Sequence, residues 1–215
     1  MDSFFLNLLS IMLRDIKYGI KSSWIRRKEE ILSKFDESLK EGLIDDRILP
    51  TLNLINGLPH YYTVSSCSGR IIILDLPEVG DKKSAIFRGR WHRCVEKNEV
   101  LNAISECTKE GWFILNPPII HVISDDIINA EKILSIAIKC GFKRSGIKSI
   151  KRDKITVEIN STEMIETIIS KNGYVLADDY YIITLVEYAN KKFCRFQQKI
   201  ERLNVRLYEL YTIHD

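Results

Sequence analysis

Residues 62–71 read YTVSSCSGRI and join two runs with the composition of buried strands, HYYTVSS at 60–66 and RIIILDL at 70–76. β-Branched and aromatic residues dominate both runs, whereas the joining residues are small and polar. One reading is a hairpin turn whose serine hydroxyls bond to their own backbone. Such a turn needs neither a cysteine nor an arginine, so residues 65–70 are also a candidate ligand-binding loop.

Further segments with the texture of strands lie on the C-terminal side of this loop. They are SAIFRGRWH at 84–92, WFILNP at 112–117, PIIHVIS at 118–124, FKRSGIKSI at 142–150 and KITVEIN at 154–160. Short turns that join such strands favour an α+β fold with a largely antiparallel sheet over a doubly wound parallel sheet. Residues 164–176 are ambiguous between strand and helix.

Apolar residues at helical spacing predict the helices that flank this sheet. They span 24–40, 45–56, 98–111, 129–141 and 178–211, and a shorter amphipathic or core-docked helix is expected at 4–13. Two of them, 98–111 and 129–141, end in a glycine that is followed by an aromatic residue opening a strand. This similarity suggests an internal duplication. No Pro-, Gly- or Ser-rich boundary divides residues 1–215, so a single domain is expected.

Composition and cysteine usage restrict the class of protein. The chain has 215 residues, of which 45% are hydrophobic and 28% charged, and no apolar run approaches the roughly 20 residues that span a bilayer. A soluble cytoplasmic protein is expected. The five cysteines form no Cys-x-x-Cys pair, which argues against a disulfide framework and a zinc knuckle. A zinc set of Cys67, His92, Cys94 and His121 is disfavoured by the scattered positions, and no metal is expected.

Positive charge is concentrated in two segments although the net charge is only +3. The segment 139–154 holds seven basic residues and one acid, and the last helix adds six more basic residues. By themselves such segments are usually solvated faces.

Nucleotide-binding fingerprints are missing, because the sequence contains neither G-x-G-x-x-G nor G-x-x-x-x-G-K-[ST]. In the loop at 65–70, Gly69 permits close approach of a ligand and Arg70 can bind a carboxylate through two hydrogen bonds. Cys67 is read as a structural thiol rather than a nucleophile.

Four histidines are candidates for proton transfer. His92 follows Trp91 at the end of a strand, whereas His121 lies in an apolar run that favours a packing role. His60 and His214 are read as surface residues.

Taken together, the motifs YYTVSSCSGRI, GRWH, PPIIHV, GFKRSGI and EYANKK resemble those of the third wybutosine-synthesis protein family, of the archaeal type. The resemblance runs from about residue 24 to 207 and leaves residues 1–20 as an extension. It implies an S-adenosylmethionine-dependent methyltransferase without a Rossmann-like fold. The implied substrate is the N-4 nitrogen of a wyosine-type guanosine derivative next to the anticodon of phenylalanine tRNA. The alternative is a tRNA-binding or S-adenosylmethionine-binding protein without catalysis.

The resemblance matches several residues by position, and the chemistry of the implied reaction suggests roles for these and other residues. The cofactor-binding candidates are Ser66, Ser68, Gly69, Arg70, Trp91 and Asn190. His92 is the first candidate for the general base and His121 the second. The candidates for substrate binding are Lys28, Lys148, Lys151 and Arg152. The segment RGRWHRCVEK lacks the second histidine that some eukaryotic relatives carry after the tryptophan.

Overall fold

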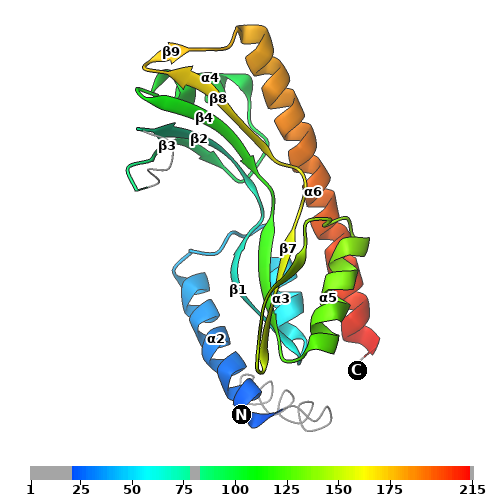
Figure 1. Ribbon diagram of the computed structural model, residues 1–215. Coiled ribbons are helices and arrows are strands. Elements are labelled where there is room, and N and C mark those ends of the chain that lie inside the picture. The colour runs from blue at the N-terminus through cyan, green and yellow to red at the C-terminus, as the bar shows by residue number, and fades with distance from the viewer. Residues whose placement is uncertain (1–20, 78–82, 214–215) are drawn as a thin grey trace. The chain divides into compact units, whose positions relative to one another are not determined.

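The computed structural model describes residues 21–77 and 83–213 (Figure 1). The expected helix at 4–13 and His214 lie outside the described residues. None of the described helices is long and apolar enough to cross a membrane. The chain divides into two compact units, and each unit combines stretches that are distant in sequence.

The first unit contains the chain up to Ser66, residues 120–159 and the chain from Ile200. Its four-stranded sheet has the order β1-β5-β7-β6. These strands are β1 (Tyr61–Cys67), β5 (Ile119–Ser124), β7 (Lys154–Asn160) and β6 (Gly146–Lys151). Strands β6 and β7 form the antiparallel hairpin that their sequence predicts.

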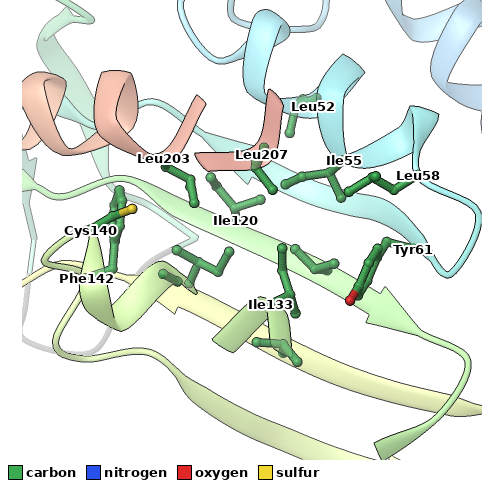
Figure 2. Close-up of a cluster of buried hydrophobic side chains, with 14 of the residues drawn as sticks. Leu52, Ile55, Leu58, Tyr61, Ile120, Ile133, Cys140, Phe142, Leu203 and Leu207 are labelled. Atoms are coloured by element: carbon green, nitrogen blue, oxygen red, sulfur yellow. The ribbon is translucent and has the colours of Figure 1, made fainter. Parts of the chain in front are cut away.

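Helices cover one face of this sheet and enclose a hydrophobic core with it. They are α3 (Leu49–Gly57), α5 (Ile127–Lys139) and the last part of α6 (Asp179–Ile213). Figure 2 shows Leu203 and Leu207 of α6 near Ile55 of α3 and Ile120 of β5. The Asp126 side chain caps α5 by accepting a hydrogen bond from the Asn129 backbone, 2.7 Å.

Helix α2 (Ser22–Lys40) packs against the other face of the sheet. Alternation along β5 turns Ile120 toward the core described above and Ile123 toward α2. Ile123 is buried there with Trp24 and Tyr62, whose ring centroids lie 5.0 Å apart. The Trp24 indole also donates to the Pro59 carbonyl, 3.1 Å. The helix is therefore fixed close to the start of β1.

The second unit contains residues 67–119 and 160–199. Its five-stranded sheet has the order β3-β2-β4-β8-β9, and its described pairs are antiparallel. The strands are β3 (Ile86–Trp91), β2 (Arg70–Leu76), β4 (Glu110–Asn116), β8 (Ile165–Lys171) and β9 (Tyr174–Val175). Helix α4 (Lys97–Ser105) and the first part of α6 pack on this sheet over a second hydrophobic core.

A buried carboxylate joins three segments of the second unit. Asp75 of β2 is only 2% exposed and accepts hydrogen bonds from the backbone of Thr108 and Lys109 and from Arg88 of β3. Burial by itself would raise the pKa of Asp75, but the two backbone N–H donors and Arg88 outweigh it and lower this pKa. Asp75 is therefore a charged residue that its surroundings favour in the ionised form.

The α+β fold and the antiparallel sheets are confirmed, and residues 164–176 resolve into β8 and β9. The hairpin reading of 62–71 is wrong, because β1 and β2 belong to different sheets. The helix expected at 98–111 ends at Ser105, and Gly111 lies inside β4, where an added Cβ would meet Ser170 Oγ at 2.1 Å. Gly111 therefore permits close packing instead of capping a helix. The single-domain and duplication hypotheses stay predictions.

Candidate active site

A row of polar side chains crosses all four strands of the first unit. Ser65 of β1, His121 of β5, Glu158 of β7 and Lys148 of β6 follow one another in the order of the strands. His121 Nδ1 lies 3.1 Å from Ser65 Oγ, and His121 Nε2 lies 3.2 Å from Glu158 Oε2. Lys148 Nζ lies 3.0 Å from the other Glu158 oxygen. We call this set the histidine row.

The geometry of the histidine row suits a residue that accepts and releases a proton. In the neutral tautomer that carries its proton on Nε2, the ring donates to Glu158 and Nδ1 can accept from the Ser65 hydroxyl. The Ser65 carbonyl oxygen also lies 3.1 Å from Nδ1. It can receive the new N–H once the ring is protonated. The neutral and the protonated His121 ring therefore both have hydrogen-bond partners among Ser65 and Glu158.

The loop that follows β1 owes part of its sequence to packing. Gly69 has φ of 93°, and an added Cβ would lie 2.7 Å from the Phe196 ring. Glycine is required there by the backbone and by the contact with α6. Ser68 is fully buried, and its carbonyl accepts from Gln197 of α6, 3.2 Å. The cofactor-binding roles of Ser68 and Gly69 stay predictions.

Two other residues of this loop have features expected of ligand-binding groups. The Ser66 hydroxyl is shielded from solvent and has no hydrogen-bond partner among the described residues. Buried hydroxyls are normally paired, so this one is suited to a bound ligand. Arg70 opens β2 and is partly exposed.

His92 and Trp91 lie at the end of β3 in the second unit. His92 Nε2 is 3.8 Å from Cys67 Sγ. The Trp91 ring covers Gly89, where an added Cβ would lie 2.0 Å from it. The ring packs at the margin of the core of the second unit.

Two further candidates make contacts that hold the fold together. Asn190 of α6 accepts from the Val95 backbone N–H at 3.0 Å and donates to the Val95 carbonyl at 2.8 Å. Lys28 of α2 donates to the Leu58 carbonyl, which lies just before β1. These bonds assign both residues a structural task, and their proposed contacts with cofactor or substrate stay predictions.

The basic candidates of the hairpin β6–β7 differ in their surroundings. Lys148 forms an ion pair with Glu158. Lys151 and Arg152 are exposed at the turn of the hairpin. The turn is formed by Asp153, a non-glycine residue with φ of 56°. Exposed cations at a hairpin tip are accessible to a phosphate backbone.

Sequence reasoning missed Glu158 and misjudged His60. Glu158 lies in KITVEIN between two buried apolar residues, Val157 and Ile159, so alternation alone predicts that it faces away from the core. Its contact with His121 depends on the adjacency of β5 and β7. The His60 side chain is partly buried, and its Nδ1 lies 2.6 Å from Asp125 Oδ2. His60 is therefore not a plain surface residue.

A pocket of about 380 Å³ lies in the first unit between α2, α3 and β1. Ile31, Phe35 and Leu52 contribute apolar walls, and β1 contributes the continuous stretch 63–66. Ser65 thus borders the pocket and also contacts His121.

Comparison with known proteins gives the family of this chain. Residues 26–209 match the family described as methyltransferase TYW3. The chain belongs to this family.

Relatives of known name are similar over nearly their whole length. A Pyrococcus abyssi protein named tRNA(Phe) 7-((3-amino-3-carboxypropyl)-4-demethylwyosine(37)-N(4))-methyltransferase 1 is 43% identical, covering 86% of this chain and 96% of its own. A Methanocaldococcus jannaschii protein with the corresponding methyltransferase name is 37% identical, covering 87% and 98%.

A solved structure has the same fold as this chain. A Pyrococcus horikoshii protein superimposes with a TM-score of 0.82 at 40% identity, covering 85% of this chain and 94% of its own. The α+β fold without a Rossmann-like sheet is therefore shared with this solved structure.

Proposed function

We propose that this protein methylates the N-4 nitrogen of a 4-demethylwyosine-type guanosine next to the anticodon of phenylalanine tRNA, with S-adenosylmethionine as the methyl donor. The observation that carries the proposal is the family match over residues 26–209, together with relatives that are about 40% identical and named for this reaction. The histidine row supplies a group of the kind that the reaction needs.

The loop after β1 fits the amino-acid end of the methyl donor. S-Adenosylmethionine supplies an electrophilic methyl group on a sulfonium. Its carboxylate suits a guanidinium such as that of Arg70, which is partly exposed at the start of β2. Loss of this contact in Arg70→Ala should weaken cofactor binding by about 1.5–3 kcal/mol.

The ring nitrogen loses a proton when it gains the methyl group, and His121 is the proposed acceptor. A general base works best when a third group orients it, and Glu158 does this for His121. The Ser65 hydroxyl, which lies 3.1 Å from Nδ1 and can donate to it, can pass the proton from substrate to ring. The sequence predicts His92 as the first candidate, and we propose His121 instead because Glu158 orients its ring.

Methyl transfer tests the proposal directly. The protein is incubated with methyl-labelled S-adenosylmethionine and phenylalanine tRNA that carries the tricyclic base without the N-4 methyl group. Label should enter this tRNA and should not enter tRNA that is already methylated. Binding of both ligands without transfer of label would leave a non-catalytic tRNA-binding or S-adenosylmethionine-binding protein.

A further inference from the structure

The pocket between α2 and β1 has the size and lining of a site for a planar ring. Its volume of about 380 Å³ lies within the usual range for small-molecule sites, roughly 300–1,000 Å³. Ile31 and Phe35 provide apolar surface from one side of α2. An aromatic or apolar wall of this kind contacts the face of a heterocycle, while polar groups must contact its edge.

Polar groups are available at the β1 wall. The shielded Ser66 hydroxyl lacks a partner among residues 21–77 and 83–213, and Ser66 is one of the residues that line the pocket. Because an unpaired buried hydroxyl costs free energy, a ligand edge that pairs with it is favoured. Lys34 of α2 adds a cation to the rim, which suits a phosphate or a carboxylate of the ligand.

The position of Ser65 indicates which ring enters the pocket. Ser65 lines the pocket and contacts His121, which Glu158 orients. A ring in the pocket would therefore lie beside the hydroxyl that leads to a proton acceptor. The methyl-accepting base must release a proton, whereas the adenine of the methyl donor does not.

We propose that this pocket binds the tricyclic base that is methylated, taken out of the stack of the anticodon loop. The inference rests on the proposed function, because it takes the substrate from it. A base in a single-stranded loop can leave its stack at a cost of a few kcal/mol, and the pocket contacts repay this cost.

The test measures a preference between two tRNAs, so it does not depend on catalysis. The dissociation constant of the protein is measured for phenylalanine tRNA with the 4-demethyl tricyclic base and for the same tRNA with unmodified guanosine. The wild type should prefer the tricyclic base. Ser38→Trp fills the pocket from α2 and should reduce this preference at least tenfold, with affinity for the unmodified tRNA unchanged.

Two further variants make the result decisive. Ser33→Trp adds the same ring to an exposed position of the same helix that does not line the pocket, and it should keep the preference. Val64→Phe narrows the pocket from the opposite wall at an exposed residue, and it serves if Ser38→Trp does not fold.

Three results would overturn the inference. The first is a wild type that does not prefer the tRNA with the tricyclic base, and the second is a pocket-filling variant that keeps this preference. The third is a pocket-filling variant that loses binding of S-adenosylhomocysteine while the preference stays, which would assign the pocket to adenine. A wild type that prefers the tricyclic tRNA but transfers no label would instead contradict the proposed function and leave the pocket as a binding site.

Discussion

Each unit contains a carboxylate that joins neighbouring strands, and the two carboxylates have different surroundings. Asp75 in the second unit is 2% exposed and bound largely by backbone N–H groups, whose positions the fold fixes. The Glu158 side chain in the first unit is 13% exposed and bound by the side chains of His121 and Lys148. Fixed donors favour one charge state, whereas a histidine partner can change charge. We therefore propose that Asp75 serves stability and that Glu158 serves proton transfer.

The largest expected effect is on stability and comes from Asp75→Asn. The substitution leaves Arg88 without its buried ion pair and replaces a charged acceptor of two backbone bonds. Breaking a buried pair typically costs about 3–5 kcal/mol, and chemical denaturation should show a loss of about 3 kcal/mol in the free energy of unfolding at pH 7. The surface pair Lys97–Asp179 provides the control, since Asp179→Asn at a side chain 80% exposed should cost less than about 1 kcal/mol.

The pH dependence of this loss follows from the lowered pKa of Asp75. A depressed folded-state pKa adds stability above the usual aspartate pKa of about 3.9 and loses it as the pH falls through the folded-state value. The difference between wild type and Asp75→Asn should therefore be constant at neutral pH and shrink in acid below about pH 4. A difference that grew in acid would contradict the assignment.

The next effect is on turnover and comes from Glu158→Gln. The amide keeps the shape of the side chain but removes the charge that supports a protonated His121. Turnover should fall about 10-fold or more, with little change in the Michaelis constant for tRNA or in unfolding. Glu131→Gln, on an exposed position of α5 in the same unit, is the control. If Glu158→Gln raised the Michaelis constant and left turnover unchanged, Glu158 would serve binding instead.

The smallest effect is expected from the exposed cations of the hairpin β6–β7. Replacing Lys151 and Arg152 by alanine should weaken tRNA binding at low salt and reduce the salt dependence of the association constant, with the logarithmic slope lowered by about 1.5–2. Cofactor binding should not change. The same experiment on Lys191 and Lys192 of α6 shows whether the last helix carries the phosphate contacts, and an unaltered slope in both cases would make both segments solvated faces.

The sequence predicts individual helices and strands more reliably than it predicts which of them lie next to each other. The alternation in KITVEIN predicts both β7 and the outward position of Glu158, because strand periodicity is a local property. The partner of Glu158 is set by the strand order, which places β7 beside β5 and His121. The same limit explains the wrong hairpin at 62–71, where two good strand patterns joined by a short loop enter different sheets.

Individual site residues show the same limit. The loop pattern predicts Ser66 as a site residue, but only the positions of its neighbours reveal that its hydroxyl has no partner within the described part of the chain. The sequence does carry a signal for Asp75, because an acid inside the apolar run IIILDL lies either at a sheet edge or in the interior with hydrogen-bond partners. The loop pattern predicts a ligand contact at Gly69, whereas its approach to Phe196, 127 positions later in the chain, gives it a packing role that no local pattern contains.

The central claim is that His121, oriented by Glu158, accepts the proton during methyl transfer. Single-turnover rates of His121→Gln and His92→Gln, measured across pH with tRNA and S-adenosylmethionine at saturation, test it most directly. We expect His121→Gln to lose on the order of 10²-fold in rate and the pH dependence of the wild type, and His92→Gln to keep the wild-type profile. A His121→Gln variant that stays folded and follows the wild-type profile would contradict the claim.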